Sequence, residues 1–289
     1  MDTAVFSVVY PGVETYFSEF LSTLSKQTDR NFTLFLINDG LSNIEDFLKK
    51  ADLDVKVKDA GGLPAALRKI GIRWVQESGA KIIIFADSDD YFAKNRVEIS
   101  RDMLVEYDLV FNELVLTGKE VTDSTPMLET YFSDGEIVSC KHIKTANCMG
   151  LTNTALRVNS IPSYFDQIPE NIIAFDWALF SLCLHAGAMG VFTKKTVTYY
   201  RQHGNNLASP NSFTEVQILR GVQVKQDHYQ MLSRFYEKYV PMADMFEKLL
   251  TQLQSDGTLR QKYCQAVRKH ATALPLWWEP IKLLKELEL

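Results

Sequence analysis

The first ninety residues alternate short apolar runs with amphipathic stretches, and this order constrains the fold more than any other feature of the chain. Apolar residues between positions 17 and 24 recur at helical spacing, and residues 64–78 form a second helical stretch with Pro64 in its first turn. Alternating strands and helices imply right-handed crossovers, so the predicted fold class is α/β with a doubly wound, mostly parallel sheet. The predicted strands are Val5–Tyr10, Thr33–Ile37, Val55–Val57 and Lys81–Ala86.

The pattern becomes less regular beyond Asp87. Residues 118–146 are rich in Asp, Glu, Ser and Thr and are predicted to be an insertion that contains loops. The remaining predicted elements are a strand over Asp108–Leu116, a helix over Trp177–Ala186 and a β-rich segment over Val191–Tyr200.

Only helices are predicted from Phe213 onward. We place a boundary near residue 210, at the Ser209-Pro210-Asn211 turn, and expect a helical appendage over residues 211–289. One regular apolar stripe supports this prediction: Met242, Met245, Phe246, Leu249, Leu250 and Leu253.

Charge and composition exclude several classes of protein. The chain has 31 basic and 36 acidic residues, a balance that argues against binding of a nucleic-acid backbone as the main function. No apolar run approaches the roughly 18–20 residues that span a bilayer, and the first residues lack the features of a signal peptide. We therefore expect a cytoplasmic protein whose cysteines are reduced thiols without a CxxC spacing: Cys140, Cys148, Cys183 and Cys264.

Polar residues follow each predicted strand of the first half. In an open parallel sheet, ligands bind outside the carboxyl ends of the strands. The segments at these ends are Tyr10-Pro11-Gly12, Asn38-Asp39, Asp59–Gly62 and Asp87-Ser88-Asp89-Asp90. Three aspartates within four residues repel one another unless a cation lies among them, and carboxylate oxygens suit Mg²⁺ or Mn²⁺. The alternative is that Asp89 and Asp90 cap a following helix.

Ordered segments of the chain resemble one family of enzymes. Four segments are similar to motifs of family 2 glycosyltransferases with the GT-A fold: SVVYPGVETYFSEFLSTLSKQT, LFLINDG, PAALRKIGI and IIIFADSDDYF. Two later segments resemble the acceptor-side acidic motif and the closing motif of that family: AFDWALFSLCLHAG and YYRQHGNN. The resemblance covers about residues 5–207. It implies a GT-A catalytic domain over residues 1–210, a nucleotide-sugar donor, a divalent metal ion (Mn²⁺ or Mg²⁺) and inversion at the anomeric carbon.

The resemblance assigns donor-binding roles to several residues. Asp39 would bind the donor base, and its carboxylate suits uracil or thymine because both present an N3–H donor. Tyr10, Pro11 and Gly12 would line the base and ribose pocket, mainly through backbone contacts. Arg68 would contact the base or the diphosphate. The alternative for Tyr10, Pro11 and Gly12 is a plain strand-to-helix turn. The alternative for Arg68 is a solvated arginine on a helix.

The diphosphate and metal site is assigned in the same way. Asp87, Ser88 and Asp89 form the DxD motif, in which Asp89 would ligate the metal ion directly. His203 would complete the metal or diphosphate site, beside Arg201 in a loop that faces the phosphates. A structural histidine is the alternative.

The resemblance makes Asp176 the general base on the acceptor side. Asp176 begins a separate predicted helix, and apolar residues of that helix would anchor it from behind. The alternative is that Asp176 only caps this helix. The family's usual Glu-Asp pair reads Phe175-Asp176 here, and Glu170 is the next candidate for the base. A second departure, Gly12-Val13-Glu14 in place of the usual TYN, affects the expected ribose contacts.

The resulting functional interpretation is an inverting glycosyltransferase that moves a sugar from a UDP- or dTDP-linked donor to a hydroxyl group. The acceptor class implied by the resemblance is a growing glycan or glycoconjugate, including a lipid-linked glycan. The alternative is a non-catalytic module that binds nucleotide sugars or a partner. A nicotinamide dehydrogenase is excluded because no GxGxxG follows the first strand.

The C-terminal tail allows two interpretations. Basic residues near Trp277 and Trp278 would suit contact with the inner face of a membrane, close to a lipid-linked acceptor. Acidic residues are interleaved with them, which favours a helix packed against the catalytic domain or against a second subunit in a homo-oligomer.

Overall fold

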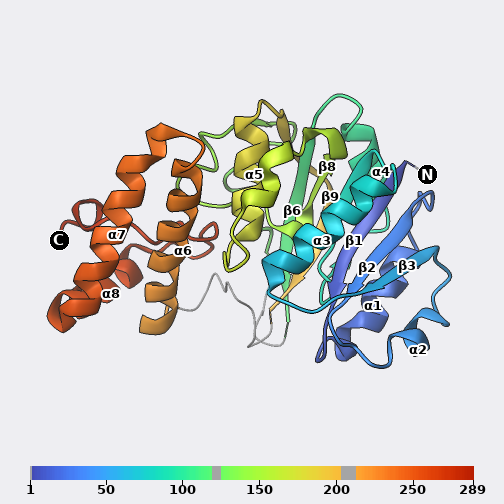
Figure 1. Ribbon diagram of the computed structural model, residues 1–289, viewed down its shortest axis with the longest axis horizontal. Helices are drawn as coiled ribbons and strands as arrows, with labels where there is room; N and C mark the ends of the chain where they lie inside the picture. Colours follow the sequence, from blue (N-terminus) through green and yellow to red (C-terminus); the bar gives the residue numbers. More distant parts are fainter. Residues whose placement is uncertain (1, 119–124, 203–212) are drawn as a thin grey trace.

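The computed structural model (Figure 1) describes residues 2–118, 125–202 and 213–289. The described residues form one nine-stranded sheet in the order β3-β2-β1-β4-β8-β6-β9-β5, with β7 paired to β9. The strands are β1 (Thr3–Val9), β2 (Thr33–Asn38), β3 (Val55–Asp59), β4 (Ile82–Phe85), β5 (Tyr91–Phe92), β6 (Leu109–Thr117), β7 (Ile137–Val138), β8 (Thr154–Arg157) and β9 (Gly190–Arg201). The helices are α1 (Glu14–Ser25), α2 (Ile44–Leu48), α3 (Pro64–Glu77), α4 (Arg96–Met103), α5 (Phe175–His185), α6 (Glu215–Ser233), α7 (Val240–Ser255) and α8 (Gly257–His270).

The first half of the sheet is parallel and is covered by helices on both faces. β1 pairs in parallel with β2 and β4, and β2 pairs in parallel with β3. Successive side chains of β1 belong to different cores: Phe6 packs with residues of α3 and α5, whereas Val5 packs with residues of α1 and α4. The strands are apolar throughout because both of their faces are buried. The predicted doubly wound α/β fold is confirmed.

The second half of the sheet mixes directions. β8 lies antiparallel between β4 and β6, β9 runs parallel to β6, and β5 pairs antiparallel with β9. β5 and β8 could not be predicted from the sequence, because each is very short and is stabilised by pairing with strands far away in the chain. The predicted strand over Asp108–Leu116 corresponds to β6, and the predicted β-rich segment over Val191–Tyr200 corresponds to β9.

α3 packs unusually close to β1. A Cβ atom added at Gly71 would lie 2.1 Å from ring atoms of Phe6, so the helix approaches the strand only because this position has no side chain. This approach holds the N-terminal end of α3, which carries Arg68, against the sheet.

The C-terminal helices lie beside the sheet on the α5 side (Figure 1). α6 begins with a capping box formed by Thr214 and Gln217, and Asp256 caps α8. His228 of α6 stacks on Trp177 of α5, with ring centroids 3.7 Å apart. One buried apolar cluster therefore runs from the sheet into this helical region.

The prediction of helices alone after Phe213 is wrong for residues 271–283, which contain no α-helix. Pro275 and Pro280 explain the difference, since proline lacks an N–H and disfavours a helical residue before it. This segment returns to the sheet region, where Trp277 forms an isolated β-bridge with Asn147.

Candidate functional site

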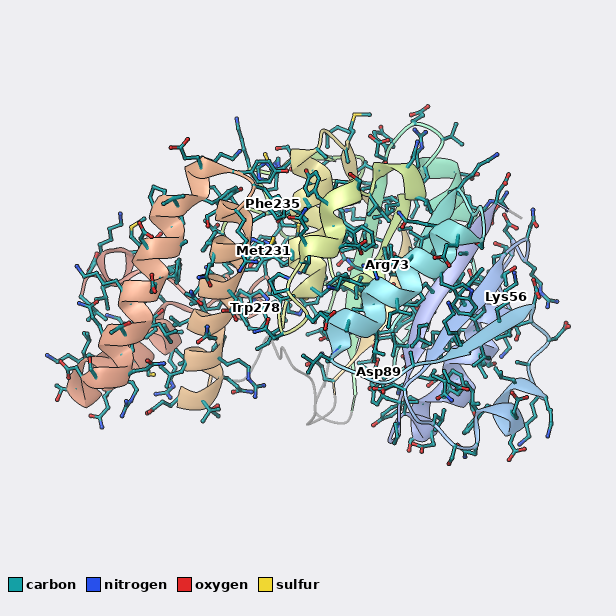
Figure 2. The ribbon with its side chains drawn as sticks, viewed as in Figure 1. Lys56, Arg73, Asp89, Met231, Phe235 and Trp278 are labelled. Carbon is teal, nitrogen blue, oxygen red and sulfur yellow. The ribbon has the colours of Figure 1, made fainter. Side chains whose placement is uncertain are left out.

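The carboxyl ends of the first strands bring predicted site residues together. The hydroxyl of Tyr10, which follows β1, donates to Asp89 Oδ2 at 3.3 Å. Arg68, in α3, lies 4.0 Å from Asp87 Oδ1 through its Nη2 atom. Asp89 is at the edge of the sheet where β1 ends (Figure 2). The structure therefore brings Tyr10, Arg68, Asp87 and Asp89 together at this end of the sheet.

The Asp87-Ser88-Asp89-Asp90 turn divides into partly exposed and buried residues. Asp87 and Asp89 are partly exposed. Ser88 is buried and donates its hydroxyl to the Val8 carbonyl at 2.7 Å, so it fixes the turn to β1. Asp90 is buried and accepts from the Arg201 backbone N–H at 2.7 Å. The alternative in which Asp89 and Asp90 cap a helix is wrong, because β5 follows the turn and α4 begins only later.

The carboxylates of this turn repel one another electrostatically. Burial raises the pKa of Asp87 to about 6, and the charges of Asp89 and Asp176 act in the same direction, while Arg68 opposes them. Burial and the neighbouring carboxylates also raise the pKa of Asp90 well above its usual range. A cation among these carboxylates would relieve the repulsion.

The donor set fits a divalent ion that shares its coordination with substrate. Asp87 and Asp89 would supply hard oxygen ligands, and Mg²⁺ is commonly held by one or two carboxylates together with substrate phosphates. Among the described residues, no group of three or more His, Cys, Asp or Glu side chains is arranged to hold a metal ion. His203, the other predicted ligand, lies outside the described residues.

Asp176 is the second residue of α5 and is partly buried. Its Oδ1 accepts from the Trp177 backbone N–H at 2.7 Å, and its Oδ2 accepts from Asn147 Nδ2 at 3.0 Å. The N-cap position is Ala174, so Asp176 is not the helix cap. Burial raises the pKa of Asp176 to about 6, against the influence of these donors and of Arg68. Arg68 and Asp87 therefore lie within electrostatic range of Asp176.

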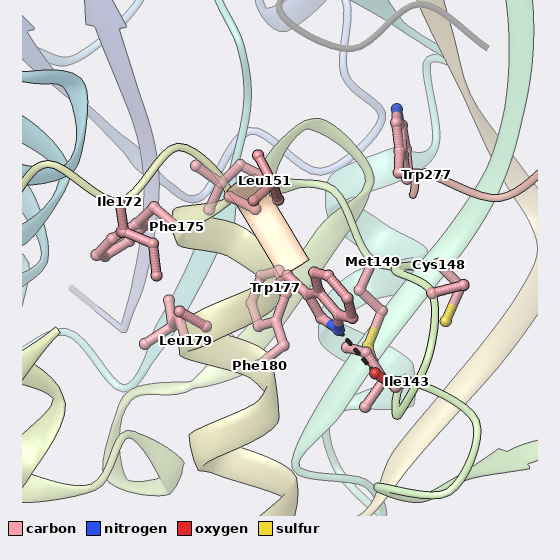
Figure 3. Close-up of a cluster of buried hydrophobic side chains, with 14 of the residues drawn as sticks. Ile143, Cys148, Met149, Leu151, Ile172, Phe175, Trp177, Leu179, Phe180 and Trp277 are labelled. Carbon is pink, nitrogen blue, oxygen red and sulfur yellow. Dashed lines mark hydrogen bonds between the residues drawn. The ribbon is translucent and has the colours of Figure 1, made fainter. Parts of the chain in front are cut away.

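The rest of α5 anchors Asp176 as the sequence suggested. Leu179, Leu182 and Cys183 are fully buried. The indole N–H of Trp177 donates to the Ile143 carbonyl at 2.7 Å (Figure 3). The first turn of α5 is thus fixed on both sides.

The predicted base-binding region is formed by the ends of β1 and β2. The Asp39 backbone N–H donates to the Val9 carbonyl at 2.8 Å, while no described residue forms a hydrogen bond or ion pair with the Asp39 carboxylate. Pro11 packs beside Gly40. Gly12 has a φ of +103°, a conformation that favours glycine, and its N–H donates to Glu14 Oε2 at 2.6 Å.

Two other predicted residues make contacts within the protein. The Arg201 guanidinium donates to the Asp89 carbonyl at 2.8 Å and to Glu19 at 2.6 Å, so it supports the turn that carries Asp89. Glu170 is exposed and forms an ion pair with Lys69 at 3.7 Å.

Two residues near the site were not predicted from the sequence. Burial raises the pKa of Tyr200, and the charges of Asp90, Asp89 and Asp87 act in the same direction, while the Tyr200 ring packs against Trp277. Asn147 contacts Asp176 directly. Asn147 lies in an irregular segment with no periodic pattern, so no local signal pointed to it.

Comparison with known families identifies the domain. The sequence model of Glycosyl transferase family 2 matches residues 5–153. The chain belongs to glycosyl transferase family 2. Its mixed sheet is that of the GT-A glycosyltransferases, and the predicted relationship to this family of sugar-transferring enzymes is confirmed.

One curated protein and two solved structures are similar to this chain. The poly(ribitol-phosphate) beta-N-acetylglucosaminyltransferase TarS of Staphylococcus aureus is 25% identical over 240 residues, which cover 76% of this chain and 40% of TarS. The crystal structure of TarS residues 1–349 in complex with UDP-GlcNAc has a TM-score of 0.58 at 17% identity and covers 92% of this chain and 88% of that one. The mannosyltransferase PcManGT from Pyrobaculum calidifontis, in complex with GDP-Man and Mn²⁺, has a TM-score of 0.57 at 12% identity and covers 94% and 76%.

The chain spans less than half the length of the curated relatives it matches, from 14% of an uncharacterized Rickettsia bellii glycosyltransferase to 46% of one from Haemophilus influenzae. Within the part of the family 2 chain that the structure describes, no helix is long and apolar enough to cross a membrane.

Proposed function

We propose that this family 2 member is an inverting glycosyltransferase that transfers a sugar from a UDP- or dTDP-linked donor to an acceptor hydroxyl group. The observation that carries the proposal is the position of Asp176, whose pKa is raised to about 6 and which lies within electrostatic range of Arg68 and Asp87. A carboxylate with such a pKa is ionised at neutral pH and is still a useful proton acceptor. Strongly perturbed carboxylates in a crevice are typical of functional sites.

The donor would bind along the carboxyl ends of β1, β2 and β4. Asp39 would accept the N3–H of uracil or thymine, and its carboxylate has no described partner that would have to be displaced. Tyr10, Pro11 and Gly12 would line the base and ribose. Arg68 would contact the diphosphate. The diphosphate would then compete with Asp87 for the Arg68 guanidinium.

Asp87 and Asp89 would hold the divalent ion, Mn²⁺ or Mg²⁺, and His203 is the third proposed ligand. When bound, such an ion offsets the negative charge that grows on a departing diphosphate. Arg201 would support this part of the site by holding the backbone of Asp89.

Asp176 would take the proton from the acceptor hydroxyl group as its oxygen attacks the anomeric carbon. Inversion by direct displacement requires the base to lie across the sugar from the diphosphate. Asp176 belongs to α5, whereas Asp87 and Asp89 follow β4, so the two groups come from separate elements.

The proposed acceptor is a growing glycan or glycoconjugate, including one linked to a lipid. TarS, by its name, acts on poly(ribitol-phosphate), so a polyol-phosphate chain is a suitable first acceptor to test. Transfer to such a growing acceptor would place this family 2 protein in the cytoplasm or at the inner face of the membrane.

Turnover of UDP-sugars with Mn²⁺ tests the proposal. Asp176→Asn should lower kcat by about 10²–10⁴, the effect of losing a positioned general base, while UDP affinity stays within about twofold because Asp176 is not assigned to the donor. The matched control is Asp102→Asn, an exposed aspartate on α4. An Asp176→Asn variant that keeps more than about a tenth of kcat would move the base elsewhere, with Glu170 next to be tested.

Phe175 supports a second candidate, a non-catalytic module that binds nucleotide sugars or a partner. Phe175 is a buried side chain at the position where the family resemblance leads one to expect glutamate. A protein that binds UDP with Mn²⁺ and neither hydrolyses nor transfers any donor sugar would favour this candidate.

A further inference from the structure

Asn147 is completely buried and its side chain makes two hydrogen bonds. Its Oδ1 accepts from the Met149 backbone N–H at 3.1 Å, and its Nδ2 donates to Asp176 Oδ2 at 3.0 Å. The orientation of the amide follows from this pair of contacts, since the Met149 N–H requires an acceptor and a carboxylate requires a donor.

The C-terminal tail holds the backbone of Asn147. The Asn147 N–H donates to the Trp277 carbonyl at 2.9 Å. The Trp277 ring is buried beside Gly150, where an added Cβ would lie 3.1 Å away, and it meets the Tyr200 ring at a centroid distance of 5.8 Å. Figure 3 shows Trp277 on the same side of the cluster as Met149 and Cys148. Residues far apart in the chain thus enclose the segment that carries Asn147.

The tail is itself fixed to the sheet domain. The Tyr131 hydroxyl donates to Glu279 Oε2 at 2.9 Å and lies 3.1 Å from the Leu274 carbonyl. The carboxylate of Glu279 also accepts from the Leu276 N–H at 2.9 Å. Residues 274–279 therefore have a defined conformation over the 147–150 segment.

We propose that Asn147 is a positioning residue for Asp176 and that the C-terminal segment 274–279 holds Asn147 in place. This inference rests on the proposed role of Asp176 as the general base. Trp177 N–H and Asn147 Nδ2 each occupy one oxygen of the Asp176 carboxylate, and together they fix its plane. Each carboxylate oxygen keeps a second acceptor position, which is left for the hydroxyl group of the incoming acceptor.

Because Asn147 donates from a neutral amide, it influences the pKa of Asp176 differently from a cationic side chain. Asp176 accepts hydrogen bonds from the Trp177 N–H and Asn147, and the charges of Arg68 and Asp87 act on it electrostatically. A hydrogen bond from Asn147 favours the ionised form of the Asp176 carboxyl group. A second cation in place of Asn147 would lower the pKa of Asp176 further and make it a weaker proton acceptor. Removing this hydrogen bond should therefore raise the pKa of Asp176.

Asn147→Asp tests the inference because it preserves the shape of the side chain and the acceptor for the Met149 N–H. We expect kcat to fall by about 10- to 100-fold, as when a catalytic group is misplaced by about 1 Å. The acidic limb of the kcat profile should move upward by about one pH unit, and the KM for the donor should change by less than about twofold. Asn147→Ala should move the limb in the same direction.

A matched control separates positioning from general loss of stability. Asn95 also makes two side-chain hydrogen bonds, to the Lys195 carbonyl and from Thr196, and it contacts neither Asp176 nor the tail. Asn95→Ala should leave the acidic limb in place. If the Asn147 variants do not fold, Trp277→Ala should shift the limb upward while Trp277→Phe, which keeps a ring against Tyr200, shifts it less.

Asp176→Asn, measured in parallel, distinguishes failure of the proposed base from failure of the positioning role of Asn147. Full turnover in Asp176→Asn would refute the proposed base itself. Loss of turnover in Asp176→Asn, together with a wild-type kcat and an unshifted limb in Asn147→Asp, would overturn only the positioning role. A limb that stays unshifted in Trp277→Ala would overturn the role of the tail.

Discussion

Replacing Asp176 by asparagine removes the proposed base, and it should make the protein more stable relative to the wild type at pH 8 than at pH 5. Burial raises the pKa of this carboxyl group from 3.8 to about 6 in the folded protein. Between these two values the folded state binds more protons than the unfolded state, so stability falls as the pH rises through this window. Asparagine does not titrate, so the variant does not lose stability at this position as the pH rises.

The size of the effect follows from the same two values. Linkage over the interval from pH 5 to pH 8 gives a loss of about 1.4 kcal/mol for the wild type. Because Asp176 is partly exposed, solvent screening reduces this figure, and we expect about 1 kcal/mol. For a chain of this size the corresponding shift in Tm is about 2–4 °C. The asparagine amide cannot accept both hydrogen bonds, but that cost is similar at the two pH values and cancels in the comparison.

Thermal unfolding of wild type and Asp176→Asn at pH 5 and pH 8 measures the difference. The advantage of the variant should be larger at pH 8 by the amount given above. Asp102→Asn, at an exposed position, is the control variant for this comparison. An advantage that is equal at both pH values, or that is larger at pH 5, would refute the electrostatic argument for this site.

Four further substitutions probe the donor site, the metal site and the core. Asp39→Ala should weaken UDP binding by about 1.5–3 kcal/mol, the range for a hydrogen bond to a charged group, and calorimetry in which GDP or CDP binds more tightly than UDP and dTDP would contradict this. Asp89→Ala should abolish turnover while circular dichroism remains native, whereas full wild-type activity in excess EDTA would argue against the metal. His228→Phe should raise the free energy of unfolding by about 1 kcal/mol, because both buried ring nitrogens lack a described hydrogen-bond partner. This gain should grow below pH 6.5 in chemical denaturation, since burial keeps the pKa of His228 well below that value and only the unfolded chain takes up the proton. Gly71→Ala should lower the Tm through a cost of about 1–3 kcal/mol, because a Cβ would overlap the Phe6 ring, and an unchanged Tm would be inconsistent with the packing of α3 on β1.

The parallel half of the fold was predictable because its signals are local. The run Lys81–Ala86 is apolar on both faces, and a turn follows it directly. The structure places β4 within this run. β8 carries no comparable signal, since four residues (Thr154–Arg157) do not establish a periodicity and their pairing with β4 and β6 is a tertiary effect.

The site was predictable where strand topology determines it. Asp87 and Asp89 follow a buried strand, and the structure brings them to Tyr10 and Arg68 as expected. The direction in which each side chain points was not predictable. Ser88 turns its hydroxyl toward the backbone of β1, a choice that depends on atoms from another strand.

Asn147 shows a second limit of sequence reasoning. A buried amide in an irregular segment has no periodic pattern, and its partner Asp176 is 29 residues away in the chain. The β-bridge between Asn147 and Trp277 joins residues that are still farther apart in the chain. Such contacts form only when the whole chain has folded.

The burial of α5 has a consequence for how the protein responds to heat and to different acceptors. All of its residues except Asp176 and His185 are buried. A local opening of this helix would expose nine buried residues to water, so its amide hydrogens should exchange with solvent only through global unfolding. Asp176 therefore occupies one fixed position for as long as the protein is folded. Acceptors of different shape must be accommodated by the surrounding irregular segments, and the temperature at which the proposed activity is lost should coincide with the Tm.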